Sequence, residues 1–329
     1  MKIAVVILNW NGKKLLEKFL PGIVEFSKIA SVYVADNAST DDSVLFVKNN
    51  FPTVTIIENS GNFGFAKGYN QALKYVDADI YALINSDVEV TENWLIPMIK
   101  TFADEPATAI IQPKILDFNN KDFFEYAGAA GGFIDKYGYP FCRGRIFENI
   151  EKDNNQYDDA SIFWASGACF LIRSTVYWEM EGFDDDFFAH QEEIDLCWRV
   201  FNNGYDAKYV SKSTVYHVGA ATLEISNPKK TYLNFRNSLL MLIKNLPENK
   251  IAVIIFIRMI LDGVAAFKFL FNGNVGHFAA VIKAHYSFYM MLKGTLKKRQ
   301  FYQKNNYFFV KSIVFQYFVK KRKFFYHIF

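Results

Sequence analysis

The stretch Ile3-Ala4-Val5-Val6-Ile7-Leu8-Asn9-Trp10-Asn11-Gly12 decides the fold, because a short β-branched run ends abruptly in polar residues. Similar apolar runs follow at Val32 to Ala35, Val54 to Ile57 and Ile80 to Ile84. Their length and composition are typical of strands buried on both faces of a parallel sheet. Helical patterns lie between them, so the sequence predicts a doubly wound α/β sheet with right-handed crossovers.

The predicted helices have recognisable starts and apolar faces. The first runs from Gly12 to Phe26, and the second begins at Thr40 to Ser43, where a capping residue is followed by acidic residues. Two more are expected from Ala66 to Val76 and from Glu92 to Phe102. Later in the chain, Ser161 to Ile172 indicates a strand with a break in its middle.

Polar loops follow three of the predicted strands: Asn9 to Gly12, Asp36 to Thr40, and Asn85 to Asp87. Ligands of such sheets bind at the carboxyl ends of the strands, so three polar loops at one edge predict a binding site. Each loop alone would also fit ordinary turn chemistry. The segment Gly61 to Asn70 adds glycines that open a helix, where backbone amides could approach a phosphate.

The segment Phe187 to Arg199 places three carboxylates among aromatic and apolar residues. Burial raises the pKa of a carboxyl group, which suits Glu192 or Glu193 to act as a general base. The alternative is structural: both glutamates would complement a helix dipole, and Asp195 would pair with Arg199 four residues later. The residues alone leave both readings open.

Composition limits the class of protein. With 329 residues, 51% of them hydrophobic, the chain can form one large domain or two smaller ones with a sizeable core. The first residues lack the features of a signal peptide, so a cytoplasmic protein is expected. Cys142, Cys169 and Cys197 have no metal-ligand spacing and fit reduced core thiols.

The C-terminal part is strongly basic, because no acidic residue follows Asp262. Its lysines alternate with bulky aromatic clusters, which favour an anionic membrane surface over nucleic acid as the partner. Ile251 to Phe271 approaches a membrane-spanning length, but three charges interrupt it and favour an interfacial helix. We therefore expect two parts, 1–240 as the α/β domain and 241–329 as a basic, aromatic, helical membrane-associating region.

Five ordered motifs resemble those of the family 2 glycosyltransferases with the GT-A fold, particularly the rhamnosyltransferase-like enzymes of bacterial surface polysaccharides. The resemblance covers about residues 1–240 and implies a Rossmann-like mixed sheet flanked by helices. The motifs are Val6 to Asn11, Asp36 to Thr40, Gly61 to Ala66, Asn85 to Val88 and Glu192 to Cys197.

The resemblance implies a site for a pyrimidine nucleotide-sugar, dTDP-rhamnose or a UDP-sugar. Asp36 would hydrogen-bond the base, and the loop after the first strand would pack along the base and its ribose. The implied donor-binding residues are Leu8, Asn9, Trp10, Asp36, Asn62, Gly64, Lys67, Asn85 and Ser86.

The same resemblance assigns a metal site and a base. Asn85 to Asp87 occupies the position of the family's DxD motif, so Asp87 and the downstream His217 would hold a divalent cation, Mn²⁺ or Mg²⁺. Glu193 stands where the family has its catalytic aspartate, and Glu192 is the alternative base.

The acceptor would lie over the Ser166-Gly167 turn, with Asp195 nearby and Trp164 as a platform for a sugar face. A tryptophan in the core is the alternative for Trp164. Together these residues predict an inverting glycosyltransferase acting on a saccharide or lipid-linked acceptor at the cytoplasmic face of the membrane. A sugar nucleotidyltransferase and a catalytically degenerate assembly protein are the other hypotheses, and the sequence leaves the oligomeric state open.

Overall fold

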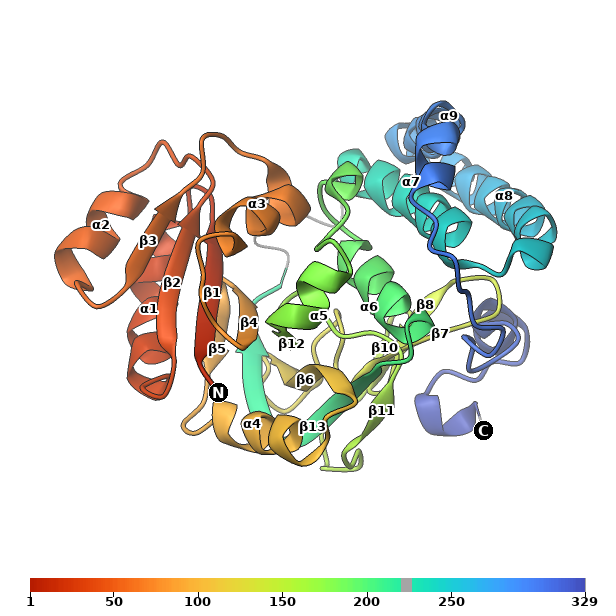
Figure 1. Cartoon of the computed structure of the whole chain (residues 1–329). Helices are drawn as coiled ribbons and strands as arrows, with labels where there is room; N and C mark the ends of the chain where they lie inside the picture. Colours follow the sequence, from red (N-terminus) through yellow and green to blue (C-terminus); the bar gives the residue numbers. More distant parts are fainter. Residues whose placement is uncertain (220–226, 329) are drawn as a thin grey trace.

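The computed structural model describes residues 1–219 and 227–328. Its first part alternates strands and helices, as the sequence predicts (Figure 1). These elements are β1 (Ile3–Asn9), α1 (Lys13–Phe26), β2 (Ser31–Asp36), α2 (Ser43–Asn50), β3 (Thr55–Glu58), α3 (Gly64–Leu73) and β4 (Ile80–Asn85).

Strands β4, β1, β2 and β3 pair in parallel in that order. Alternate residues of β1 are buried on opposite faces: Val5 packs in one hydrophobic cluster and Val6 in the other. This two-sided burial explains the continuous apolar run, because neither face of the strand meets water. The register places Asn9 opposite Asp36 and Leu8 opposite Asn85, so the polar strand ends meet at one edge.

The second half of the sheet contains both parallel and antiparallel strands. The simple doubly wound pattern does not predict this, but the family resemblance does. Strand β12 lies antiparallel between β4 and β6, and β13 runs parallel to β6. The break in the predicted strand at 161–172 is confirmed. The elements are β5 (Val88–Val90), α4 (Leu95–Asp104), β6 (Thr108–Asp117), β11 (Ala160–Ile162), β12 (Cys169–Arg173), α5 (Ser174–Glu179), the short turn η1 (Asp185–Phe187), α6 (Glu192–Asn202) and β13 (Asp206–His217).

The irregular segment after β6 forms a second, four-stranded antiparallel sheet. Its strands are β7 (Gly132–Ile134), β8 (Pro140–Cys142), β9 (Arg145–Ile146) and β10 (Asn149–Ile150). All three cysteines are buried and unpaired, as expected for core thiols.

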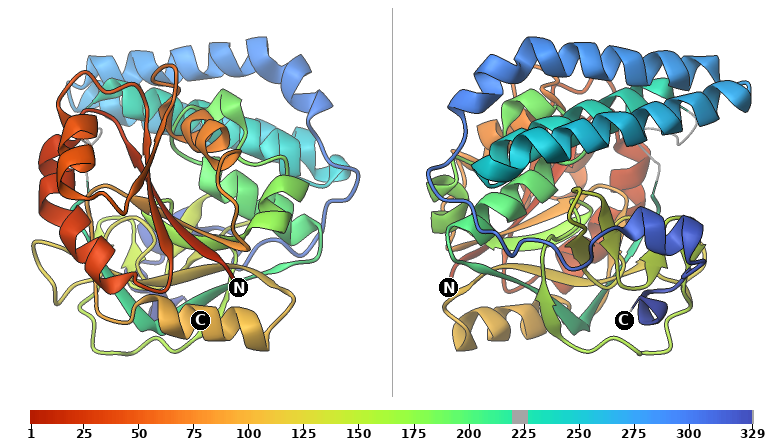
Figure 2. Two further views of the ribbon diagram at one scale, coloured as in Figure 1. Left: turned by 60° about the vertical axis from the view of Figure 1, so that its left-hand side comes forward. Right: turned by 90° about the vertical axis from the view of Figure 1, so that its right-hand side faces the viewer.

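Three long helices follow: α7 (Pro228–Asn245), α8 (Glu248–Phe271) and α9 (Val275–Lys297). The expected boundary at residue 240 falls inside α7. Both views in Figure 2 show the three helices at the end of the molecule toward which β1 points, opposite the N-terminus. Among the helices of the described residues, none combines the length and the apolar character needed to cross a bilayer.

The residues after Lys297 correct the expectation of a helical C-terminal region. Between residues 298 and 328, the structure shows two short helical turns, η2 (Phe315–Val319) and η3 (Phe325–His327). The rest runs back over the small sheet, where Val310 bridges to Asp135 and where Tyr307 and Phe325 are buried. Part of the aromatic content read as a membrane belt therefore belongs to the hydrophobic core.

Candidate active site

The carboxyl ends of β1 and β2 are joined by side-chain hydrogen bonds. Asn9 Nδ2 donates to Asp36 Oδ1 at 2.9 Å, and the Ser39 hydroxyl donates to the same oxygen at 2.6 Å. The Ser39 amide donates to Asp36 Oδ2 at 2.8 Å. Both carboxylate oxygens of Asp36 thus already accept hydrogen bonds within the chain, and the residue fixes the shape of the loop.

Around this cluster, several predicted donor-binding residues come together. Asn9 Oδ1 is buried without a hydrogen-bond partner, and a Cβ on Gly12 would lie 2.4 Å from it. The same Cβ would lie 3.8 Å from Ser86 Oγ, which places the β4 loop beside the β1 loop. Trp10 is 52% exposed at the rim of this edge. The loops after β1, β2 and β4 therefore lie next to one another, as the strand order predicts.

The start of α3 differs from expectation. The amides of Phe65 and Ala66 donate to the carbonyl oxygen of Phe188, at 2.7 and 3.3 Å, and the Gly64 amide donates to Asn62 Oδ1 at 3.0 Å. The amides expected to approach a phosphate therefore already have partners in the chain. Gly64 has a φ of +74°, and a Cβ there would come within 2.6 Å of the Phe188 ring, so close packing requires glycine.

Lys67 lies in the first turn of α3 and remains a candidate for the donor phosphates. Its ammonium group lies 4.7 Å from the centre of the Phe63 ring. Asn85 forms the end of β4, and its backbone N–H donates to the carbonyl oxygen of Ala168.

The antiparallel pairing of β5 and β13 brings His217 opposite Val88, next to Asp87. His217 Nε2 lies 3.2 Å from Asp87 Oδ1, and Nδ1 lies 3.3 Å from Glu125 Oε1. All three side chains are buried. The two predicted metal ligands, Asp87 and His217, are therefore adjacent. Glu125 is a third side chain in this cluster, and the sequence analysis missed it because it belongs to no recognisable motif.

The electrostatics of this group follow from its geometry. Burial alone would lower the pKa of His217, but the adjacent carboxyl groups of Asp87 and Glu125 outweigh it and raise the pKa to about 10. The imidazolium therefore offsets part of the negative charge of the two carboxylates. Within the described residues, no three His, Cys, Asp or Glu side chains form a complete metal site. Asp87 and His217 fit a cation whose other ligands come from a bound diphosphate.

Glu192 and Glu193 begin helix α6. Burial raises the pKa of Glu193 to about 7, and burial together with the neighbouring Glu193 raises that of Glu192 well above its usual value. From His190 to Glu193, each side chain has a buried polar atom without a hydrogen-bond partner in the described structure. Unpartnered polar atoms are costly, and four in succession indicate a site that a ligand completes.

The loop before these glutamates is strained and held from outside. Phe188, His190 and Gln191 all have positive φ values, between 62° and 73°. Asn237 Nδ2, on α7, lies within 2.7 to 3.0 Å of the carbonyl oxygens of residues 187, 189 and 190. Asn237 thus positions the loop, a long-range role that carries no motif in the sequence.

The two residues of the Ser166-Gly167 turn have different roles: Ser166 holds the turn in place, and Gly167 borders the candidate site. The Ser166 hydroxyl donates to the carbonyl of Ala127 at 2.5 Å, and its amide donates to Gln112. A Cβ on Gly167 would lie 3.8 Å from the Glu193 carboxyl carbon and 3.5 Å from Phe65. Gly167 therefore borders the candidate base, whereas Ser166 is buried behind it.

Two residues expected at the acceptor belong to the core instead. Trp164 is buried, its ring covers Gly132, and its indole N–H donates to Phe133 O at 2.8 Å, so it offers no open face to a sugar. Asp195 is fully buried and pairs with Arg199 at 2.9 Å and with Lys244 at 2.8 Å. For Asp195 the structural interpretation, an ion pair with Arg199, is the correct one.

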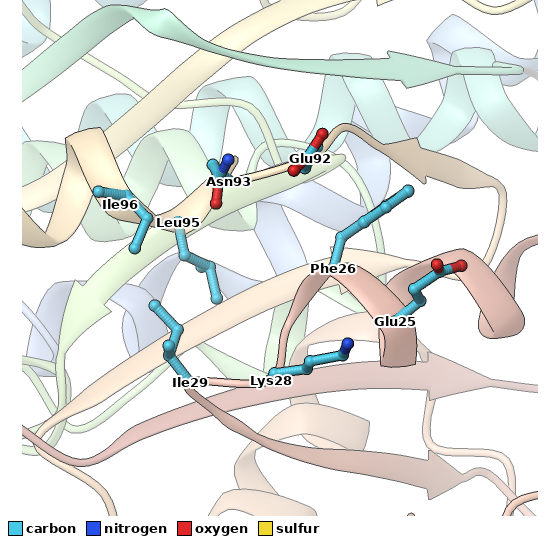
Figure 3. Close-up of a pocket in the computed structure, with 8 residues that line it drawn as sticks. All are labelled: Glu25, Phe26, Lys28, Ile29, Glu92, Asn93, Leu95 and Ile96. Carbon is cyan, nitrogen blue, oxygen red and sulfur yellow. The ribbon is translucent and has the colours of Figure 1, made fainter.

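A separate pocket lies away from this edge (Figure 3). It lies between the end of α1 and the turn into α4, with Phe26, Lys28, Glu92 and Asn93 in its lining. Helix α1 returns from the carboxyl edge of the sheet to the amino edge, so this pocket cannot join the strand-end site.

Several relatives of this chain are named as glycosyltransferases, and two of them are rhamnosyltransferases. N-acetylglucosaminyl-diphospho-decaprenol L-rhamnosyltransferase of Mycobacterium tuberculosis is 23% identical over 235 residues, which cover 65% of this chain and 75% of that protein. Rhamnosyltransferase WbbL of Escherichia coli is 23% identical over 65% of this chain and 83% of its own length.

Solved structures share the fold at low identity. GalNAc-T7 with UDP, GalNAc and Mn²⁺ has a TM-score of 0.60 at 14% identity; the match covers 76% of this chain but only 49% of that one. TarS of S. aureus in complex with UDP has a TM-score of 0.51 at 15% identity, covering 78% and 70%. A family model described as glycosyl transferase family 2 matches residues 4–181, more than half of the chain. The chain therefore belongs to glycosyl transferase family 2 and is a glycosyltransferase with a GT-A-like mixed sheet.

Proposed function

We propose that this enzyme transfers a sugar, with inversion, from a pyrimidine nucleotide-sugar to a saccharide or lipid-linked acceptor in cell-surface polysaccharide synthesis. The observation that carries the proposal is the row of unpartnered buried atoms from His190 to Glu193, beside Gly167 and near the strand-end site. Relatives named as rhamnosyltransferases, one with a decaprenol-linked acceptor in its name, favour dTDP-rhamnose first and UDP-sugars next.

In the proposed reaction, Glu193 accepts the proton of an acceptor hydroxyl as that oxygen attacks the anomeric carbon. The bond from this carbon to the diphosphate oxygen breaks, and the nucleoside diphosphate leaves with the bonding electrons. Asp87 and His217 would hold a divalent cation that stabilises the leaving diphosphate. The Mn²⁺ in two solved neighbours supports such a cation. The enzyme would act on the cytoplasmic side, associated with the inner face of the membrane.

Nucleotide binding tests the donor class. We expect UDP or dTDP to bind at least about tenfold more tightly than GDP, a difference of roughly 1.4 kcal/mol, and only with Mn²⁺ present. Titration calorimetry with each nucleotide, with and without Mn²⁺, measures this. One solved neighbour is a mannosyltransferase in complex with GDP-Man, so tighter binding of GDP is a real alternative that would overturn the pyrimidine assignment. Glu25→Gln, at the distant pocket, is the control and should bind as the unchanged protein does.

Glu125 gives a second test, directed at the cation. If His217 Nε2 is a ligand, the Nδ1–H must donate to Glu125, which fixes the ring and increases its basicity. Glu125→Gln should then weaken Mn²⁺ binding in the presence of UDP by about 10- to 100-fold. Electron paramagnetic resonance of free Mn²⁺ measures this without turnover. Glu89→Gln removes an exposed carboxylate on the same strand pair and should change nothing; equal affinities for all three proteins would contradict the role of Glu125.

A further inference from the structure

The outer face of helix α8 is apolar along its length. Val253, Phe256, Ile260, Val264, Phe267 and Phe271 follow one another at intervals of three or four residues and are between 52% and 85% exposed. This spacing puts them on one side of the helix. Isolated exposed apolar residues are common, but a continuous row of large ones indicates an interaction surface.

Two of the three charged residues that interrupt the apolar sequence of α8 face the protein, whereas Lys268 is exposed. Arg258 and Asp262 are the ionisable residues between Ile251 and Phe267, and they are 3% and 1% exposed. Arg258 donates to the Tyr137 carbonyl and to Ser238, and Asp262 lies 3.3 Å from His285 Nε2. The inner side of the helix therefore buries Arg258 and Asp262 together with Ile254 and Ala266, while its outer side is lined by large apolar residues, unlike a helix on a water-exposed surface.

Helix α9 continues this surface. Val275, Ile282, Tyr286, Tyr289 and Met290 are between 54% and 69% exposed. Each row also contacts the other helix: the ring centres of Phe267 and Phe278 lie 6.0 Å apart, and the Tyr289 hydroxyl contacts Met259. We call these outer residues of α8 and α9 the α8–α9 face.

The exposed charges on α8 and α9 are mainly positive, with Glu248 at the start of α8 as an acidic exception. Lys268, Lys283, Lys293 and Lys297 are exposed on the two helices, and no acidic residue occurs after Asp262. Long lysine side chains can lay their stems on an apolar surface and place the ammonium group at lipid headgroups. Two copies joined through the same face would bring these lysines together, which disfavours a symmetric dimer.

The face also lies close to the candidate active site in the fold. Helices α8 and α9 pack against α7, and α7 carries Asn237, which holds the loop before Glu192. Figures 1 and 2 show the three helices at the end toward which β1 points. A surface that binds this face would therefore lie beside the edge where the acceptor must enter.

We propose that the α8–α9 face inserts into the headgroup and acyl boundary of an anionic bilayer and so brings the site to its acceptor. This inference names the surface through which the function proposed above would reach a lipid-linked substrate, and in that sense rests on it. The two helices would lie in the interface plane, with the apolar rows toward the acyl chains and the lysines toward the phosphates.

Vesicle sedimentation tests the proposal. The unchanged protein should bind vesicles of phosphatidylglycerol and phosphatidylcholine, and bind vesicles of phosphatidylcholine alone more weakly. The double variant Phe256→Asp, Val264→Asp should lose at least about tenfold in partitioning to the anionic vesicles, because two apolar side chains lose their burial. The control is Leu45→Asp, Tyr75→Asp, which adds the same charge at exposed apolar residues outside α8 and α9 and should bind as the unchanged protein does.

Nucleotide binding to the same variants separates the two proposals. The Phe256, Val264 variant should bind UDP or dTDP normally, which shows that it is folded. If the unchanged protein binds vesicles but binds no nucleotide, the result would support membrane contact through the α8–α9 face and overturn the proposed nucleotide-sugar donor. Absent vesicle binding by the unchanged protein, or equal binding by both double variants, would overturn the docking face. If light scattering shows that the unchanged protein is a dimer and that the Phe256, Val264 variant is a monomer, the α8–α9 face binds a second copy of the chain. That result would also overturn the proposed membrane contact.

Discussion

Replacing Glu193 with glutamine is expected to lower kcat by about 10²- to 10⁴-fold while leaving nucleotide binding nearly unchanged. The amide keeps the shape of the side chain but cannot accept the acceptor's proton. Glu193 is suited to the role because burial raises its pKa to about 7 and its Oε2 atom lacks a partner. Steady-state rates with a soluble acceptor, beside calorimetry with UDP or dTDP, measure the two effects separately.

The pH profile and the neighbouring glutamate provide the controls. A base must be deprotonated to act, so kcat should be low below pH 7 and rise through the pKa of about 7. Glu192→Gln should retain more activity than Glu193→Gln, since burial and the neighbouring Glu193 raise the pKa of Glu192 well above its usual value and so favour its protonated form. A loss confined to Glu192→Gln would transfer the catalytic role to that residue.

The strand-end site could be predicted from sequence because its parts are local. A buried parallel strand has a continuous apolar run, and the next polar residues must lie at its carboxyl edge, as Asn9, Asp36 and Asn85 do. The register of two parallel pairings, β1 with β2 and β1 with β4, then brings them together. To predict this site, it was enough to know the order of the strands, and no particular long-range side-chain contact had to be known.

Other features depend on contacts that no short pattern shows. Glu125 reaches His217 from the segment after β6, and Asn237 reaches the 187–190 loop from α7. The α3 amides looked free in the sequence, but Phe188, more than a hundred residues later, accepts their hydrogen bonds. Asp195 belongs to the acidic motif, yet α7 packs over it and buries it in an ion pair with Lys244. In each case the decisive partner is remote in the chain.

The ion-pair network that buries Asp195 leads to the second prediction with a large effect. Lys244 Nζ lies 2.7 Å from Asp184 Oδ2 and 2.8 Å from Asp195 Oδ2, and all three residues are buried. Burial alone would raise the pKa of Asp184, but Lys244 outweighs it and holds that pKa well below its usual range. Lys244 is therefore the positive charge shared by two buried carboxylates.

Lys244→Met is expected to lower the free energy of unfolding by about 3–5 kcal/mol, because it leaves these carboxylates under-compensated while keeping the side-chain volume. Urea unfolding at neutral pH measures this. Lys298→Met is the control: Lys298 also pairs with Asp184, but its side chain is 39% exposed, so its removal should cost about 1 kcal/mol or less. Equal losses in the two variants would contradict a buried network.

The position of Lys244 gives this prediction a consequence for catalysis. Through Asp195 it fastens α7 to α6, the helix whose first turn carries Glu193, and α7 also holds the preceding loop through Asn237. Weakening that junction should disturb the glutamates as well as stability. At a temperature where Lys244→Met remains folded, we therefore expect kcat to fall more than the affinity for nucleotide, since α7 packs mainly against α6, α8 and α9, whereas the donor loops follow β1 and β2.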